Sequence, residues 1–339
     1  VTAHLRGNEE MPRVAATRNK TAPQITADLV DVKGQGKPKR ALEIAAAGGH
    51  NLLFIGPPGT GKSMLARRLP GVLPPMTERE ALETAAIDSV LGRPLDVSRW
   101  RQRPFRSPHH TASPAALVGG GPGPRPGEIS RAHNGVLFLD ELPEFNRNVL
   151  EVLREPLEAG VITIARAGGQ ADFPACFQVV AAMNPCPCGY LGDLGGDCCC
   201  SAERVAAYRS KVSGPLLDRI DLHIEVGRPP KEALRSNAPA GEPSRVVAKR
   251  VHLARELQTR RGGVCNARLS GAALKEFCEP GTAALRLLEN ATDKFNLSAR
   301  AYQRVLRVAR TIADLGRQDN IAAPHVAEAL SFRQLDRRY

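Results

Sequence analysis

The chain has 339 residues and a formal net charge of +12, with 47 Lys and Arg against 35 Asp and Glu. This length allows two domains with a sizeable core, and no stretch approaches the ~18 consecutive apolar residues of a membrane-spanning helix. The polar N-terminus has no hydrophobic signal region, so we expect a cytoplasmic protein without a membrane partner. The chain starts at Val1 rather than Met, which indicates a piece of a longer protein.

The positive charge is concentrated towards the C-terminus. Residues 245–339 hold 18 Lys and Arg against nine Asp and Glu. A basic domain suggests a polyanionic partner, most often a nucleic acid. The alternative is a solvated helical surface that also carries arginines for sensing a nucleotide. Charge alone leaves both interpretations open.

In chain order, the first element is a polar segment, residues 1–28, that we interpret as a linker. Short apolar runs then alternate with helical stretches over residues 29–228, which is typical of a parallel α/β sheet. The predicted strands, each continuous and apolar, are residues 52–55, 136–139, 177–182 and 222–226. After a proline-rich linker, residues 229–245, the pattern becomes helical over 246–339. The helices predicted there are residues 246–260, 270–277, 281–295, 298–315 and 324–332.

A phosphate-binding loop follows the first predicted strand and leads into a helix. It matches G-x-x-x-x-G-K-S, the Walker A motif, with the residues Gly56, Pro57, Pro58, Gly59, Thr60, Gly61, Lys62 and Ser63. Its glycines let successive backbone N–H groups turn inward, and the helix adds the positive end of its dipole. Lys62 would reach the β- and γ-phosphates, and the Ser63 hydroxyl would bind Mg²⁺. The motif predicts that the chain binds ATP.

Two later predicted strands end in polar residues. Asp140 and Glu141 follow residues 136–139; the aspartate would hold Mg²⁺ and the glutamate would polarise the attacking water. The alternative is an acidic strand end exposed to solvent, but the Walker A motif upstream favours the functional interpretation. Asn184 follows the third strand, and its amide could orient water beside the γ-phosphate. Locally, however, Asn-Pro is also an ordinary turn opener.

Six of the eight cysteines lie between residues 176 and 200. In a cytosolic ATPase such clustering argues for metal or redox chemistry rather than a disulfide framework. The spacing favours a structural four-thiolate zinc site. Its ligands would be Cys186, Cys188, Cys198 and Cys200. The alternative is a set of reduced cysteines packed beneath the ATP site.

The order of these motifs resembles the AAA+ ATPases, and within them the magnesium-chelatase-like clade and its bacterial ComM/YifB family. The resemblance covers roughly residues 29–335 and is carried by residues 56–63, 105–111, 126–141, 184–189 and 213–221. It implies an α/β fold: an AAA+ P-loop NTPase with a three-layer core and a parallel sheet, followed by a C-terminal helical lid domain. Members usually carry an N-terminal domain resembling the Lon protease fold, which we expect this chain to lack.

The resemblance also implies roles for single residues. Asn184 corresponds to the sensor-one residue, and Arg219 to the arginine finger that enters the ATP site of the neighbouring subunit. Arg300 corresponds to the sensor-two arginine of the lid. A finger supplied by a neighbour implies a ring, here a homo-hexamer. Arg304 and Arg307 share a helical face with Arg300, and we interpret them as ordinary surface charge.

The resemblance implies two insertions that line a central pore and grip a nucleic-acid backbone. One lies around residues 114–126 with a flexible tip at 118–125, and the other is a hairpin over 160–170. An alternating apolar strand followed by Gly-Gly predicts the hairpin without the resemblance. Arg125 and Arg166 are the cations at these tips, and they could contact DNA phosphates. His109 and His110 are expected to order the first insertion or to lie near the pore.

These features together predict an ATP-hydrolysing hexameric motor that acts on single-stranded or branched DNA. The activity would be that of a helicase or branch-migration translocase in recombination or natural transformation. The alternative is a magnesium-chelatase motor subunit that drives metal insertion into a porphyrin through a partner protein. A third interpretation is a nucleotide-gated scaffold that hydrolyses ATP too slowly to do work. The presence of both Glu141 and Arg219 disfavours the scaffold.

Overall fold

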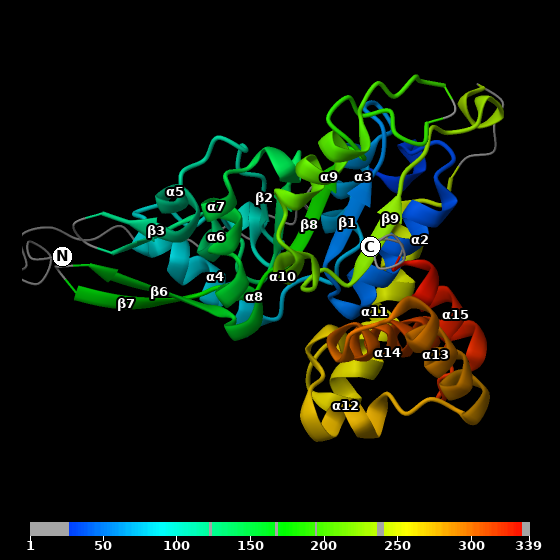
Figure 1. Cartoon of the computed structure of the whole chain (residues 1–339). Helices are drawn as coiled ribbons and strands as arrows, with labels where there is room; N and C mark the ends of the chain where they lie inside the picture. Colours follow the sequence, from blue (N-terminus) through cyan, green and yellow to red (C-terminus); the bar gives the residue numbers. More distant parts are fainter. Residues whose placement is uncertain (1–26, 122–123, 167–168, 194, 236–240, 334–339) are drawn as a thin grey trace, which may run out of the picture.

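A computed structural model of the chain describes residues 27–121, 124–166, 169–193, 195–235 and 241–333 (Figure 1). Its centre is a five-stranded sheet in the order β2-β5-β8-β1-β9, in which every pairing is parallel. The strands are β1 (Leu52–Ile55), β2 (Phe105–Arg106), β5 (Val136–Leu139), β8 (Gln178–Met183) and β9 (Leu222–Glu225). The four predicted strands are confirmed. The edge strand β2 was not predicted, because two residues carry no periodicity.

Side chains of each strand alternate between the two faces of the sheet. In β1, Leu52 and Phe54 pack in a core shared with α2 and the C-terminal helices. Leu53 and Ile55 pack in a second core on the opposite face. Helices on both faces give the predicted three-layer α/β core. These helices, with others in the same part of the chain, are α2 (Gly36–Gly48), α3 (Lys62–Ala66), α4 (Glu78–Val90), α5 (Pro114–Val118), α6 (Glu128–Arg131), α7 (Arg147–Glu151), α8 (Arg154–Ala159), α9 (Ala202–Ser210) and α10 (Gly214–Leu217).

The C-terminal part is helical, as predicted. Its helices are α11 (Ser244–Gly262), α12 (Gly271–Phe277), α13 (Thr282–Phe295), α14 (Ala299–Leu315) and α15 (Ala323–Ser331). α11 and α14 pack against α2. This helical unit lies below the sheet in Figure 1, whereas α3 lies above it. The unit therefore covers the side of the sheet where the strands begin, away from the phosphate-binding loop.

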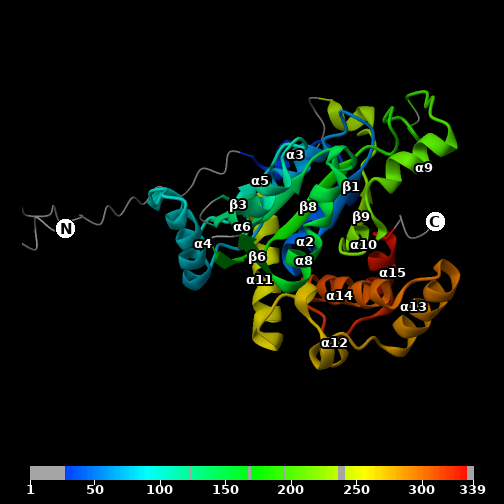
Figure 2. The ribbon, with the colours of Figure 1, turned by 60° about the vertical axis from the view of Figure 1, so that its left-hand side comes forward.

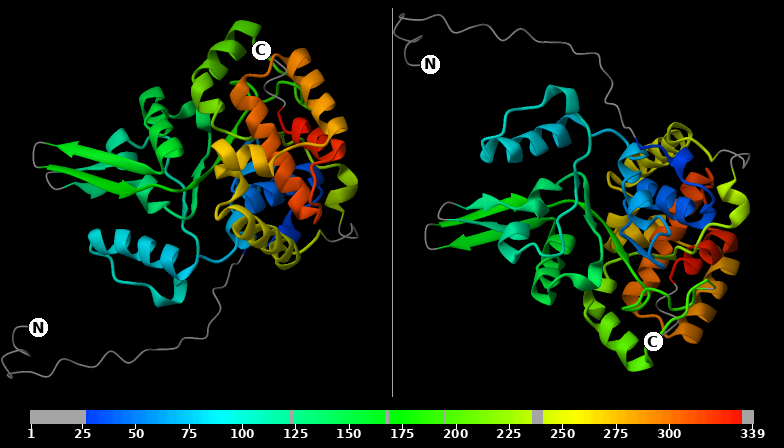
Figure 3. Two further views of the ribbon diagram at one scale, coloured as in Figure 1. Left: turned by 90° about the horizontal axis from the view of Figure 1, so that it is seen from below. Right: turned by 90° about the horizontal axis from the view of Figure 1, so that it is seen from above.

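Two hairpins project together from the sheet, and the long one is clear in both views of Figure 3. One pairs β3 (Gly119–Gly120) with β4 (Arg125–Pro126), and the predicted second hairpin pairs β6 (Val161–Arg166) with β7 (Gly169–Pro174). Gly119 has φ +111°, and a Cβ there would lie 2.7 Å from Ile164 Cδ1, so glycine permits the hairpins to touch. α4 stands beside them (Figure 2).

Some predicted segments fall outside the described residues. They are most of the linker over 1–28, the centre of the linker over 229–245, the last six residues, and positions 122–123 and 167–168 at the two insertion tips. Among the residues that are described, no helix is both long and apolar enough to span a bilayer.

Candidate active site

The strand order brings three sequence motifs to one edge of the sheet. β5, β8 and β1 are neighbours. At their carboxyl ends the chain continues into Asp140, Asn184 and the phosphate-binding loop. Parallel α/β sheets bind ligands in the crevice outside the carboxyl ends of the strands. The fold therefore places the Walker motifs and Asn184 where a nucleotide would bind.

The phosphate-binding loop needs its glycines for conformation and for close packing. Gly59 and Gly61 have φ of +75° and +89°, in the left-handed region that favours glycine. A Cβ on Gly56 would lie 2.1 Å from the carbonyl oxygen of Val226, which follows β9. These constraints hold the loop in the compact turn from which backbone N–H groups can bind phosphate.

Lys62, the first residue of α3, is buried and its ammonium donates to oxygens of the loop. Its Nζ lies 2.6 Å from Gly56 O, 2.8 Å from Pro57 O and 3.2 Å from Asn184 Oδ1. Burial lowers the pKa of Lys62 to about 8, while Asp140 and Glu141 act against this shift. The site thus holds a partly desolvated cation, which a phosphate oxygen would stabilise.

Ser63 and Asp140 form the oxygen pair expected of a magnesium site. The Ser63 hydroxyl donates to Asp140 Oδ2 at 2.6 Å, so both ligand oxygens face the same point. Mg²⁺ prefers oxygen ligands and usually keeps few protein ligands beside phosphates and water. The two residues fit that chemistry.

Glu141 has a contact that the sequence did not reveal. Its backbone is in the left-handed region, with φ +53°, and more than half of its side chain is exposed. Its Oε2 lies 3.2 Å from His110 Nδ1. The His110 ring packs at 4.1 Å from the ring of His109 and edge-on to Phe145. His110 is therefore placed to orient the carboxylate that we expect to polarise water, and no spacing in the sequence indicated this contact.

Arg219 and Arg300 lie together, but not beside the phosphate-binding loop. Both line a cavity of about 510 Å³ at the opposite edge of the sheet, where Asn51 and Asp221 precede β1 and β9. Arg219 pairs with Glu158 of α8 and donates to Pro215 O at 2.6 Å. Arg300, at the start of α14, is exposed. The two predicted nucleotide-sensing arginines thus share one site on the far edge.

The interpretation of Arg304 and Arg307 as surface charge is wrong. The Arg304 side chain is only 12% exposed and lies 3.6 Å from Asp221 Oδ1. Burial lowers the pKa of Arg304. Arg307 is half-buried and its Nε donates to Leu269 O at 2.8 Å. Arg304 joins the helical unit to the sheet edge, whereas Arg307 joins α14 to the segment before α12 within that unit.

Much of the positive charge of the C-terminal region is used inside the fold. Arg250 pairs with Glu43 at 2.6 Å, across the contact between α11 and α2. Arg261 and the 3% exposed Arg310 both pair with Asp314. These cations join helices to each other and to the core, so the net charge of the region is weak support for a nucleic-acid surface.

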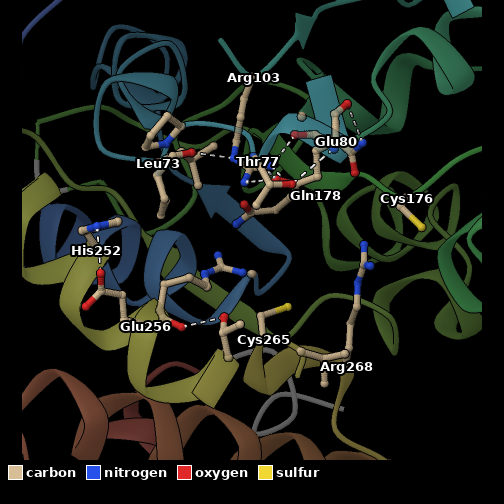
Figure 4. A pocket seen from close by; sticks show the side chains of 18 of the residues that line it. Leu73, Thr77, Glu80, Arg103, Cys176, Gln178, His252, Glu256, Cys265 and Arg268 are labelled. Carbon is tan, nitrogen blue, oxygen red and sulfur yellow. Dashed lines mark hydrogen bonds and ion pairs between the residues drawn. The ribbon is translucent and has the colours of Figure 1, made fainter. Parts of the chain in front are cut away.

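A second cavity, of about 560 Å³, adjoins the first between the sheet edge and α11 (Figure 4). Arg268 lines both cavities. Arg103 donates to Glu80 at 3.1 Å in one wall, and His252 pairs with Glu256 at 3.2 Å in the other. The sequence gave no signal for this cavity, because its walls come from segments far apart in the chain.

The four cysteines predicted as zinc ligands come together. The sulfurs of Cys186, Cys188, Cys198 and Cys200 all lie within 4.8 Å of one another, and Cys199 is exposed. Three of the separations are 3.4, 3.6 and 3.7 Å. A tetrahedral zinc site with Zn–S of about 2.3 Å needs sulfurs about 3.8 Å apart. The thiols fit a four-thiolate metal centre, and backbone N–H donation by Tyr190 lowers the pKa of Cys188 to about 6.

The two arginines predicted to contact DNA belong to the projecting hairpins. Arg125 is exposed on β4. Arg166 ends β6, and its side chain lies outside the described residues. Because the two hairpins pack against each other, both positions occur on one lobe of the molecule.

Family profiles cover most of the chain. The profile described as magnesium chelatase, subunit ChlI, matches residues 28–234, and its C-terminal profile matches residues 241–333. The chain is 51% identical over 337 residues to the uncharacterized protein YifB of Salmonella typhimurium. It is 50% identical over 341 residues to the competence protein ComM of Haemophilus influenzae. Both alignments cover 99% of this chain.

The same alignments cover 66% and 67% of the two relatives, so the chain spans about two thirds of their length. A more distant relative is the magnesium-chelatase 38 kDa subunit of Cereibacter sphaeroides, 26% identical over 220 residues and 58% of each chain. The five-stranded parallel sheet, the phosphate-binding loop and the C-terminal helices agree with these matches. The chain belongs to the magnesium chelatase subunit ChlI family of AAA+ proteins, within its ComM/YifB group.

Proposed function

We propose that this chain hydrolyses ATP at the carboxyl edge of its sheet, as its family supports. Lys62 and the backbone N–H groups of the loop would bind the β- and γ-phosphates. Ser63 and Asp140 would hold Mg²⁺, which when bound neutralises charge on the phosphates. Glu141 would polarise the attacking water, and Asn184 would orient it while keeping its contact with Lys62.

The proposed assembly of several copies rests on the position of Arg219 and Arg300. Four residues of β1 separate the two edges of the sheet, which is about 13 Å at 3.3 Å per residue. Arg219 and Arg300 lie at the amino edge, where the strands begin. They would therefore serve the ATP site of a second copy rather than that of their own chain. A head-to-tail contact of this kind gives a closed ring when its rotation divides a full turn evenly, and we propose a homo-hexamer. In the ring, the γ-phosphate of the neighbour would replace Glu158 as the partner of Arg219.

The two projecting hairpins, β3–β4 and β6–β7, favour DNA as the substrate. Arg125, an exposed cation on one of the projecting hairpins, can contact phosphates without reading sequence, which suits a translocase. The competence protein at 50% identity supports this choice. We propose a helicase or branch-migration translocase that acts in recombination or natural transformation.

A chelatase motor is the second candidate, because the chain resembles a magnesium-chelatase subunit over 58% of its length. That motor would drive metal insertion into a porphyrin through a partner protein, and nothing in its task calls for DNA. Hydrolysis of ATP would then be indifferent to DNA. The two candidates differ in one measurable response.

The test is steady-state ATP hydrolysis with and without single-stranded and forked DNA. The Glu141→Gln variant is the blank, since it keeps the phosphate-binding loop and lacks the carboxylate. The translocase account predicts hydrolysis that DNA stimulates. Hydrolysis that DNA leaves unchanged contradicts the DNA motor and favours the chelatase motor. No hydrolysis above the blank contradicts both.

A further inference from the structure

The thiol cluster lies in a long loop that leaves the sheet at the candidate active site. The loop runs from Asn184, after β8, to Ser201, the N-cap of α9, and its described residues form neither helix nor strand. Most of its described side chains beyond Cys186 are half-buried or exposed. A loop of this length without secondary structure is uncommon in a compact domain. Because little of the loop is buried, a cross-link between its two ends would stabilise it.

A metal held by the four thiols supplies that cross-link. Cys186 and Cys188 stand at the start of the loop and Cys198 and Cys200 at its end, so a common ligand closes the loop on itself. The eight cysteines of the chain are all free thiols. Their separations suit four thiolates around one Zn²⁺, and a closed four-coordinate site of this type stabilises a fold directly.

The loop packs on the phosphate-binding loop. Gly189, one residue after Cys188, has φ +88°, and a Cβ there would lie 2.7 Å from Pro58 Cδ. It would also lie 3.8 Å from Asn184 Cγ. The backbone N–H of Gly189 donates to Cys186 O at 3.0 Å, which closes the turn. The start of the loop, which carries Cys186 and Cys188, therefore packs directly against Pro58 of the phosphate-binding loop and close to Asn184.

Two further contacts anchor the loop to its surroundings. Arg209 of α9 donates to Pro185 O at 3.2 Å, next to Asn184. Arg228, beyond β9, pairs with Asp193 at 2.8 Å. These contacts hold the loop beside Asn184 and at Asp193, but neither joins its start to its end. A metal bound by the two pairs of thiols would join them, and through Gly189 and Cys186 it would position Pro58 and Asn184.

We infer that Cys186, Cys188, Cys198 and Cys200 bind one structural Zn²⁺, and that the zinc-held loop positions Asn184 and the phosphate-binding loop for nucleotide. The effect on turnover rests on the proposed ATPase function, whereas zinc binding does not. The cysteines are positioning residues: they touch neither the nucleotide nor the attacking water. Zinc loss therefore weakens ATP binding and turnover without altering the other catalytic side chains.

The first measurement is metal content and the spectrum of the cobalt-substituted protein. Wild type and Cys199→Ser carry about one zinc per chain, whereas Cys200→Ser loses most of it. Cobalt in the first two gives thiolate-to-cobalt charge-transfer bands and intense visible bands of tetrahedral Co²⁺. Cys199→Ser is the matched control, since it changes the adjacent thiol. Absence of zinc and of these bands in wild type overturns the site, whether or not ATP is hydrolysed.

The second measurement is the affinity for a fluorescent ATP analogue and the rate of hydrolysis. We expect Cys200→Ser, or wild type stripped by a chelator, to bind the analogue about tenfold more weakly. Zinc re-addition restores the stripped wild type, and Cys200→His, which keeps a zinc ligand, stays close to wild type. If the stripped protein binds the analogue as tightly as the zinc-loaded protein, the positioning role is wrong. Analogue binding reports this even if the protein hydrolyses no ATP.

Discussion

The two edges of the central sheet are built in different ways. At the carboxyl edge, the candidate residues follow their strands directly or, for Lys62 and Ser63, after one short loop, so neighbouring strands bring Lys62 within 3.2 Å of Asn184. At the amino edge, Arg219 precedes β9 and Arg300 begins α14, and they meet only because the helical unit packs there. Local sequence defines the first edge, and long-range packing assembles the second.

The two edges also hold different parts of the proposed ATP site. The carboxyl edge holds the phosphate-binding loop, the magnesium ligands and Glu141, but it has no arginine among the residues that the sequence assigned to hydrolysis. The amino edge has the arginines and no phosphate-binding loop. In our proposal, two copies of the chain complete one site.

Removing the finger should disable hydrolysis while the carboxyl edge stays intact. We expect Arg219→Ala to lower kcat about 10³-fold or more, since an arginine that neutralises γ-phosphate charge contributes that much. ATP affinity, measured with a fluorescent analogue, should stay near the wild-type value. Arg204→Ala, an exposed arginine on α9, is the control. A kcat within about tenfold of wild type would show that Arg219 is not the finger.

We expect ATP to bind more weakly in alkaline solution. Because burial lowers the pKa of Lys62 to about 8, the side chain loses its charge above that pH, and phosphate binding favours the charged form. ATP affinity should be constant below about pH 8 and fall up to about tenfold per pH unit above it. Titration of analogue binding from about pH 7 to 9.5 measures this. Lys62→Arg keeps its charge and should show no such fall; an equal fall in both proteins contradicts the assignment.

The contact between His110 and Glu141 can be tested by its effect on turnover. His110→Ala should lower kcat about two- to tenfold, the effect of losing one exposed charged contact, because Glu141 loses the partner that orients it. KM for ATP should be unchanged. His110→Asn can donate from the position of Nδ1 and should restore most of the rate. Ser107→Ala, exposed in the same segment, is the control. Equal losses in the Ala and Asn variants would reject the contact as the cause.

We expect the projecting hairpins to affect DNA binding but not ATP hydrolysis in the absence of DNA. Arg125→Ala should weaken DNA binding a few-fold and reduce the slope of log affinity against log salt by about 1. ATP hydrolysis without DNA should not change. Arg286→Ala, exposed on α13, removes the same charge elsewhere and serves as control. If the two variants have identical slopes of log affinity against log salt, Arg125 does not contact DNA.

The sequence predicted the parts whose signals are local. Four strands, five C-terminal helices and the long hairpin follow from continuous apolar runs, helical periodicity and a Gly-Gly turn. The cysteine spacing led to four thiols that do converge. The contact of His110 with Glu141 and the burial of Arg304 were missed, because each joins segments that only the folded sheet brings together. Net charge alone could not show that Arg250, Arg261 and Arg310 pair with acidic residues of the fold.

The most direct test of the two-copy site is complementation between two inactive variants. Lys62→Ala removes the phosphate-binding lysine but keeps the finger, and Arg219→Ala does the reverse. In an equal mixture, about a quarter of the contacts in randomly assembled rings would join an intact loop to an intact arginine. Our account predicts that the mixture hydrolyses ATP well above either variant alone. A mixture no more active than its components would show that each chain uses only its own residues.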